Sequence, residues 1–285
     1  MTAKQLYAEI RALYAACPQA AQWFDLQSLM RELWLKYGAE PLRHITKPEE
    51  KVDFCDDFTA DVKKALSGYP LQYITGKTAF WNGEFFVGEG VLIPRSDTER
   101  IVEAALSRID RGGVIYDLCC GSGCIGISLL MSDDRIKKCY SFDISKTALE
   151  YTEKNAKANG VADRLTAVEY DVMSGNFPMD IPPPDMIVSN PPYIRADEMP
   201  KLAENVRHEP QIALIGGEDG CDFYRTILAD FSDKLTCGGS VVFEIAPGQR
   251  DIIARLFDFY GFDAEFFEDY GGNIRAACGK KEKRY

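Results

Sequence analysis

The chain has 285 residues, of which 46% are hydrophobic and 12% aromatic, a composition typical of a globular protein with one large domain or a large and a small one. Its net charge of −11 argues against a nucleic-acid-binding protein, which usually carries a basic surface. The sequence lacks the long apolar stretch of a membrane span, and residues 1–16 are charged and amphipathic, unlike a signal peptide.

The nine cysteines form no regular framework, and their odd number favours reduced thiols in the cytoplasm. Cys119, Cys120 and Cys124 lie close together in the sequence, which raises the question of a metal site. They form no Cys-x-x-Cys pair, and both histidines, His44 and His208, are distant in the sequence. A structural zinc site normally needs four well-spaced ligands, so we expect no metal here.

Three apolar stripes at helical spacing predict a small helical domain over residues 1–70. The first contains Leu6 and Ile10, the second spans residues 26–37 before the stop signal Gly38, and the third spans residues 54–66 before Gly68. Apolar faces alone fit either a packing role or a role in substrate recognition. Both interpretations stay open, and we name 1–70 as the candidate substrate-recognition domain.

Residues 71–95 read as a linker that contains a β-hairpin. Its aromatic-rich segment, 78–87, includes Asn82-Gly83, which is a strong turn signal for a hairpin.

Residues 96–285 alternate between helical and extended patterns, which predicts an α/β domain with a doubly wound, mainly parallel sheet. Helices are expected at 101–106, from the glycine-containing loop to about Met131, at 146–158 and at about 222–235. Strands are expected at 114–118, up to Asp143, at 165–169, 186–189 and 240–245, and in a closing hairpin at 264–268 and 274–278.

A glycine-containing loop follows the first of these strands and opens a helix. It reads Asp117-Leu118-Cys119-Cys120-Gly121-Ser122-Gly123. Glycines let the backbone approach a ligand closely, and ligands of open α/β sheets bind at the carboxyl ends of strands. With Gly126, the glycines also match the Gly-x-Gly-x-x-Gly spacing of dinucleotide-binding proteins, so a nucleotide stays possible. Asp117 favours instead the ammonium group of an amino-acid tail.

Acidic residues end the next two strands. The Asp143 carboxylate can hold both hydroxyls of a ribose, although a helix cap beside Ser145 explains it equally well. Asp171, with the adjacent backbone of Val172, can meet an adenine ring, and the simpler interpretation is a solvated turn.

The tetrapeptide Asn190-Pro191-Pro192-Tyr193 ends the strand Met186–Ser189. Prolines fix φ and remove backbone N–H groups, so this loop is stiff and presents acceptors only. The Asn190 side-chain oxygen and the Pro191 carbonyl can each accept one hydrogen of a planar –NH2 group, and Tyr193 can cover its flat face. The alternative is an ordinary proline-rich turn.

Together these strand-end motifs resemble class I S-adenosylmethionine-dependent methyltransferases, and more narrowly the peptide chain release factor glutamine methyltransferases. The resemblance covers about residues 65–280, whereas the N-terminal helices match only in position and length. Cys119 stands where the wider methyltransferase pattern has its first glycine. Besides the tetrapeptide, the similar segments are 70–76 (PLQYITG), 80–81 (FW), 92–99 (LIPRSDTE), 207–210 (RHEP), 213–214 (AL) and 268–275 (EDYGGNIR).

The resemblance implies methyl transfer from S-adenosylmethionine to the side-chain amide nitrogen of the glutamine in the Gly-Gly-Gln motif of class 1 release factors, the proteins of translation termination. It implies a cytoplasmic enzyme whose partner is a protein, with no nucleic acid or membrane. Asn190, Pro191, Pro192 and Tyr193 would form the catalytic and substrate-binding loop. Arg95 and Thr98 would contact the cofactor carboxylate, the alternative for Arg95 being a surface salt bridge. The further cofactor-binding residues would be Asp117, Cys119, Cys120, Gly121, Ser122, Gly123, Asp143, Asp171, Val172 and Asn190.

Three other functions remain to be weighed. A glutamine on a ribosomal protein would need the same chemistry. A DNA adenine methyltransferase also handles a planar –NH2 group, but it must flip a base and grip phosphates, and this chain has no basic domain for that. A regulatory module that only binds an adenosyl ligand would need no amide clamp.

Overall fold

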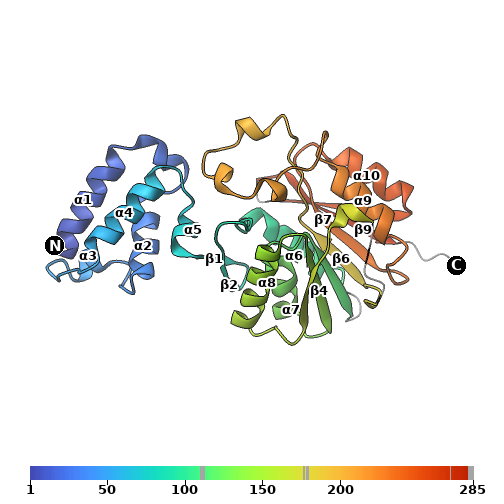
Figure 1. Ribbon diagram of the computed structural model, residues 1–285. Coiled ribbons are helices and arrows are strands. Elements are labelled where there is room, and N and C mark those ends of the chain that lie inside the picture. The colour runs from blue at the N-terminus through green and yellow to red at the C-terminus, as the bar shows by residue number, and fades with distance from the viewer. Residues whose placement is uncertain (110–112, 176, 178–179, 270, 282–285) are drawn as a thin grey trace. The chain divides into compact units, whose positions relative to one another are not determined.

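The computed structural model describes residues 1–109, 113–175, 177, 180–269 and 271–281 (Figure 1). Tyr270 of the segment 268–275 therefore lies outside the described residues. The contacts divide the chain into two compact units. Unit 1 comprises Met1–Lys77 and Ala203–His208, and unit 2 comprises Thr78–Leu202 and Glu209–Tyr285.

Unit 1 is helical, as its apolar stripes predict. Trp34 and Phe58 lie at the centre of its core, with no exposed surface. The stop signals act as expected, because Gly38 and Gly68 adopt positive φ angles of 68° and 89° just after helices end. The elements are α1 (Ala3–Ala15), η1 (Pro18–Gln22), α2 (Leu26–Lys36), α3 (Arg43–Thr46), α4 (Cys55–Leu66) and α5 (Leu71–Thr75).

The predicted hairpin forms, but its turn lies one residue earlier than the sequence indicates. Strand β1 (Lys77–Phe80) pairs with β2 (Gly83–Phe86), so Trp81 and Asn82 connect them. Trp81 has a φ of 52°, which is rare for a bulky residue. Its backbone N–H donates to Glu99 Oε1 at 2.7 Å and its indole N–H donates to Ser132 Oγ at 2.8 Å, and these two anchors hold the conformation.

Within the described residues, seven strands form one sheet in the order β5-β4-β3-β6-β7-β9-β8. The five strands from β5 to β7 are parallel, and β9 runs antiparallel to β7 and β8. This confirms the doubly wound, mainly parallel sheet and its closing hairpin. The strands are β3 (Val114–Leu118), β4 (Lys138–Asp143), β5 (Leu165–Glu169), β6 (Met186–Ser189), β7 (Ser240–Glu244), β8 (Phe262–Glu268) and β9 (Ile274–Lys281).

Helices cover both faces of the sheet, and each face has its own apolar core (Figure 1). One core contains residues of α6 (Glu99–Leu106), α7 (Cys124–Ser132) and α8 (Lys146–Ala158). The other contains residues of α9 (Asp222–Phe231) and α10 (Arg250–Phe259). Short 3-10 turns lie in the connections: η2 (Ser96–Thr98), η3 (Val172–Ser174), η4 (Met199–Lys201), η5 (Val206–His208) and η6 (Gln211–Ala213).

Two helices differ from the expectation. Helix α9 ends at Phe231 rather than near residue 235, because the chain turns there and the Thr236 N–H donates to the Pro184 carbonyl at 3.0 Å. Helix α10 was not predicted, although Ile252, Ile253 and Leu256 recur at helical spacing.

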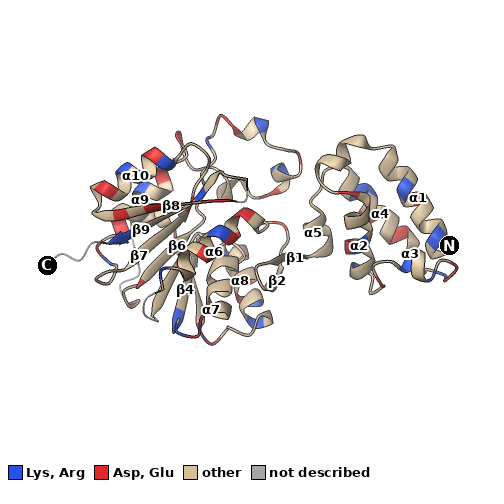
Figure 2. Ribbon diagram, turned by 180° about the vertical axis from the view of Figure 1, so that it is seen from behind, with Lys and Arg blue, Asp and Glu red and all other residues tan. Residues whose placement is uncertain are grey.

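Most charged residues lie on helices and loops (Figure 2). Strands β3, β6 and β7 carry only two, Asp117 and Glu244, each at or beside a carboxyl end. In the part of the chain that the structure describes, no helix combines the length and apolar character needed to cross a bilayer.

Asn155 connects helix α8, the hairpin and the glycine-containing loop. It has no exposed surface. Its Oδ1 accepts from the Phe86 N–H at 2.6 Å, and its Nδ2 donates to the carbonyls of Phe86 at 3.0 Å and Ser122 at 2.9 Å. One buried amide thus bonds three backbone groups, two in the hairpin and one in the glycine-containing loop.

We expect Asn155→Ala to lower the free energy of unfolding by about 3 kcal/mol, because these backbone groups would lose their partner in the interior. Asn159→Ala, on the same helix and also bonded to the hairpin, is the matched control. Its amide is more exposed and donates to Glu84 and Asn155 carbonyls, so the loss should stay below about 1 kcal/mol. Denaturant unfolding measures both, and equal losses would contradict the special role of Asn155.

Candidate active site

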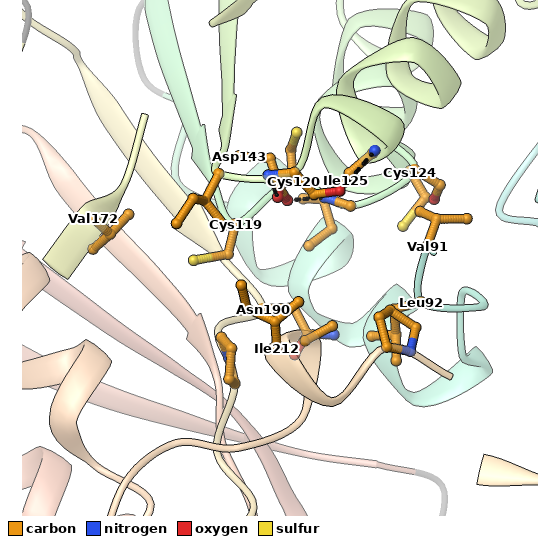
Figure 3. Close-up of a pocket in the computed structure, with 18 of the residues that line it drawn as sticks. Val91, Leu92, Cys119, Cys120, Cys124, Ile125, Asp143, Val172, Asn190 and Ile212 are labelled. Atoms are coloured by element: carbon orange, nitrogen blue, oxygen red, sulfur yellow. Dashed lines mark hydrogen bonds between the residues drawn. The ribbon is translucent and has the colours of Figure 1, made fainter. Parts of the chain in front are cut away.

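A cavity of about 300 Å³ opens at the carboxyl ends of β3 to β6, a volume at the lower end of the usual ligand-pocket range. Cys119 and Asp143 approach it from strand ends, and Ile212 comes from the segment 209–213 (Figure 3). Of the predicted site residues, the cavity is lined by Arg95, Thr98, Cys119, Cys120, Gly121, Ser122, Asp143, Asp171, Val172, Asn190 and Pro192.

At Gly121 the glycine-containing loop lines the cavity with backbone that carries no side chain. Gly121 has a φ of 56° and Gly123 a φ of 77°. The Gly121 N–H donates to Asp143 Oδ2 at 2.9 Å, which joins the first two strand ends. Gly123 does not line the cavity, and a Cβ there would lie 2.8 Å from Thr152 Cγ2. Its glycine is therefore required for packing against α8, and its contact with a cofactor stays a prediction.

Cys119 adopts the left-handed conformation that favours glycine, with a φ of 58°. This explains why the wider methyltransferase pattern has glycine there. Burial raises the pKa of the Cys119 and Cys120 thiols well above the ordinary value, so both are neutral near pH 7. The two side chains act as small apolar surfaces of the cavity.

Asp117 lies behind the loop and not on the cavity. It has no exposed surface, and its Oδ2 accepts from the Gly126 N–H at 3.0 Å. A Cβ at Gly126 would lie 2.9 Å from that oxygen, so the third glycine of the pattern serves this packing. Burial raises the pKa of Asp117 to about 7. The carboxylate thus holds the start of α7 through one oxygen, while its Oδ1 has no hydrogen-bond partner among the described residues. The direct contact of Asp117 with an ammonium group stays a prediction.

Asp143 lines the cavity, and each of its oxygens accepts one backbone N–H, from Gly121 and from Ser145, both at 2.9 Å. Ser145, not Asp143, caps α8, through its Oγ and the Ala148 N–H. A carboxylate oxygen has two lone pairs, so both oxygens can still accept a ligand hydroxyl. Burial raises the pKa of Asp143 above its ordinary value.

Asp171 and Val172 line another part of the cavity. Asp171 caps the short turn η3 by accepting the Met173 N–H at 2.8 Å. The turn places the backbone of residues 171–173 at the cavity wall.

The tetrapeptide loop is fixed by backbone pairing with residues 214–216. The Ile194 N–H donates to the Leu214 carbonyl, and the Gly216 N–H donates to the Ile194 carbonyl, both at 2.8 Å. A Cβ at Gly216 would lie 2.5 Å from the Pro192 carbonyl oxygen. Only glycine therefore allows the two backbones to approach this closely.

Within this loop, Asn190 and Pro192 line the cavity, whereas Pro191 and Tyr193 do not. The Tyr193 hydroxyl donates to Glu244 Oε1 at 3.2 Å. This hydrogen bond engages the hydroxyl and not the face of the ring, so the cover that Tyr193 would give to the flat face of a substrate group stays a prediction.

Glu244 and Thr98 form a buried pair behind Asn190. The Thr98 hydroxyl donates to Glu244 Oε2 at 2.6 Å and accepts from Asn190 Nδ2 at 3.3 Å. Thr98 lines the cavity and donates its hydroxyl proton to Glu244, and its contact with a cofactor carboxylate stays a prediction. Sequence reasoning missed Glu244, and the available signal was an acid that ends an otherwise uncharged strand.

Arg95 lines the cavity and forms an ion pair with Glu209, whose side chain is almost fully buried. Glu209 Oε2 also accepts the Ile93 N–H at 3.0 Å. The pair joins the segment before η2 to the segment 209–213, which contributes Pro210, Ile212 and Ala213 to the cavity. The salt-bridge alternative for Arg95 is thus present, but to a buried partner.

The sequence model of a family described as "Methyltransferase small domain" matches residues 98–214, which include most of this site. A "Release factor glutamine methyltransferase" from Moorella thermoacetica is 38% identical over 222 residues, or 76% of this chain and 77% of that one. One from Bacillus cereus is 38% identical over 246 residues, 84% of each chain. The chain belongs to the release factor glutamine methyltransferase family.

Solved structures share the methyltransferase fold. A methyltransferase from Pyrococcus furiosus superposes with a TM-score of 0.52 at 18% identity, covering 80% of this chain and 99% of that one. A ribosomal protein L11 methylase from Lactobacillus delbrueckii gives 0.50 at 16% identity, covering 69% and 84%. The family and the fold inferred from the sequence motifs are thus confirmed.

We expect Gly216→Ala to reduce methyl-transfer turnover between about tenfold and a hundredfold, since the new Cβ displaces the backbone of the tetrapeptide loop. Gly261→Ala is the control, because a Cβ at Gly261 would meet no other atom within 4 Å. The φ of 73° at this residue still disfavours alanine. The control should lower stability by about 1 kcal/mol and leave turnover intact. Steady-state kinetics and thermal unfolding measure both, and full turnover of Gly216→Ala would contradict this account of the loop.

Proposed function

We propose that this protein transfers a methyl group from S-adenosylmethionine to the side-chain amide nitrogen of the Gly-Gly-Gln glutamine in class 1 peptide chain release factors. The observation that carries the proposal is the orientation of Asn190 at the cavity wall. Its Nδ2 is held by Thr98, which leaves its Oδ1 as an acceptor for a ligand –NH2 group. The family membership supports a glutamine amide as the owner of that group.

The residues around the cavity suit S-adenosylmethionine. The bare backbone at Gly121 allows close approach, and Asp143 offers acceptors for ribose hydroxyls. Ile144, Val172 and Met173 provide apolar walls suited to a flat ring. When bound, this cofactor supplies an electrophilic methyl group on a positively charged sulfur.

An amide nitrogen is a poor nucleophile because its lone pair is delocalised into the carbonyl. In the proposed mechanism Asn190 Oδ1 and the Pro191 carbonyl accept its two hydrogens, which raises electron density on the nitrogen and directs its lone pair. Correct alignment can contribute roughly 7–11 kcal/mol in favourable cases. A strong base is not required, because the proton can leave after transfer, when the nitrogen is more acidic. Glu244 is not among the residues that line the cavity, so it serves as no such base.

The setting fits a cytoplasmic enzyme with a protein partner. All nine cysteines lie in the described part of the chain as free thiols, which suits a reducing compartment. The net charge of −11 suits a partner with a basic surface. We assign recognition of that partner to the N-terminal helices of residues 1–70.

The substrate is tested with labelled S-adenosylmethionine and three acceptors in parallel: a class 1 release factor, the same factor with the Gly-Gly-Gln glutamine changed to alanine, and duplex DNA. We expect label on the first alone. Label on DNA would move the function to base methylation. Label on no acceptor, with cofactor binding intact, would overturn the release factor assignment in favour of another protein such as a ribosomal one.

We expect Asn190→Ala to lower turnover by at least about a hundredfold, since the substrate nitrogen loses an acceptor that both activates and aims it. Affinity for S-adenosylmethionine should change far less. Calorimetric binding and single-turnover kinetics on the same preparation separate the two effects. A parallel loss of affinity and turnover would show that Asn190 is mainly a cofactor ligand.

A further inference from the structure

A continuous set of hydrogen bonds, partly buried at Asn190 and buried at Glu244, connects the cavity to the end of β7. Asn190 Nδ2 lies 3.3 Å from Thr98 Oγ1, and Thr98 Oγ1 lies 2.6 Å from Glu244 Oε2. Thr98 is 1% exposed and Glu244 is 2% exposed. Solvent therefore has little access to the hydroxyl that joins them.

The direction of these hydrogen bonds follows from proton counting. An ionised carboxylate can only accept, and a threonine hydroxyl has a single proton to donate. That proton goes to Glu244, so Thr98 offers Asn190 only a lone pair. Asn190 must then direct its Nδ2 to Thr98, and its Oδ1 becomes the end of the amide that is left for a ligand.

We propose that Glu244 is a positioning residue that acts through Thr98 to fix the polarity of the Asn190 amide, so that an acceptor rather than a donor meets the substrate nitrogen. This inference deepens the proposed function and rests on it for the identity of the substrate amide. Glu244 itself does not contact the cavity. The opposite polarity would present a second –NH2 group to the substrate –NH2 group, and two donors repel.

The same counting shows what protonation of Glu244 would do. A neutral carboxyl can donate to Thr98, which frees the threonine proton to point toward Asn190. Asn190 would then gain by turning its Oδ1 to Thr98 and its Nδ2 to the cavity. This relay of hydrogen bonds from Glu244 through Thr98 to Asn190 therefore holds the Asn190 amide in the productive orientation only while Glu244 is ionised.

The surroundings of Glu244 set the pH range of this relay. Tyr193 donates to Oε1 at 3.2 Å, and the Tyr224 hydroxyl donates to the Glu244 backbone carbonyl at 2.7 Å. Tyr193 and the positive charge of Arg275 favour the ionised form, whereas Asp97 and burial oppose it. Burial dominates and raises the pKa of Glu244 to about 7. The remaining titratable neighbour is the thiol of Cys124, which burial keeps neutral.

The sign of the pH effect follows directly. The ionised fraction of Glu244 grows as pH rises through about 7, so the turnover of the wild-type enzyme should rise over this range and fall below it. The neutral isostere in Glu244→Gln has no such transition. The turnover of this variant should therefore not show the rise with pH that Glu244 causes in the wild-type enzyme.

Kinetics of four variants test the relay with the release factor as substrate. Glutamine at position 244 would keep an acceptor oxygen for Thr98, so an apolar residue is used to interrupt the relay. Above the pKa of Glu244, we expect Glu244→Leu and Thr98→Val each to lower kcat by about tenfold, or about 1.4 kcal/mol, with little change in the KM for the cofactor. Thr98→Ser, which keeps the hydroxyl, should restore near-wild-type kcat. The double variant Glu244→Leu with Thr98→Val should be no slower than the slower single variant, because both interrupt one relay.

Wild-type kcat in Glu244→Leu, or additive losses in the double variant, would overturn the proposal. Thermal unfolding checks that each variant is folded. If Glu244→Leu does not fold, the comparison of Thr98→Val with Thr98→Ser decides, and equal kcat in these two would also overturn it.

A second readout needs no substrate and so separates this inference from the proposed function. The side-chain amide of Asn190, labelled with ¹⁵N, should shift with a midpoint near pH 7 in the wild-type protein and stay constant in Glu244→Gln. A pH-independent signal in the wild type would overturn the relay. If the shift is present but no release factor is methylated, the relay stands and only the substrate assignment fails.

Discussion

The site depends on one constraint, the parallel register of the central strands. Leu118 of β3 lies opposite Phe142 of β4 and Ser189 of β6, and Ser189 lies opposite Phe243 of β7. The carboxyl ends of four strands therefore lie level with one another. The loops that follow them meet at one edge without any contribution from the helices, which is why ligands of such sheets bind there.

Two buried carboxylates convert this edge into an ordered site. Burying an acid is costly unless its oxygens are hydrogen-bonded. Both oxygens of Glu244 accept hydrogen bonds, whereas in the described residues Asp117 has one bonded oxygen, Oδ2, and no partner for Oδ1. Asp117 holds the start of α7 through Gly126, and Glu244 binds Thr98 and Tyr193. Neither carboxylate touches the cavity, yet both fix the loops that do. The structure thus separates residues that contact ligands from residues that orient them.

Local patterns were enough to predict most elements and the loops of the site. The apolar run of β3 and the spacing of α8 define those elements within their own residues, and the fixed φ of the prolines defines the tetrapeptide loop. The direction of side chains was not predictable, because it depends on distant partners. Thr98 and Glu244 are 146 residues apart, and Arg95 and Glu209 are 114 apart. The hydrogen bond from the Tyr193 hydroxyl to Glu244 was not predictable for the same reason, since this buried partner cannot be read from neighbouring residues. The turn at Trp81 likewise depends on Glu99 and Ser132.

The central claim is that the methyl group reaches the side-chain nitrogen of one glutamine. Tandem mass spectrometry of the release factor after reaction with the wild-type protein tests it most directly. The account predicts a single added methyl group on the Gly-Gly-Gln glutamine, with fragment ions that place it on the side-chain amide. A methyl group on any other residue, or on the peptide backbone, would contradict it.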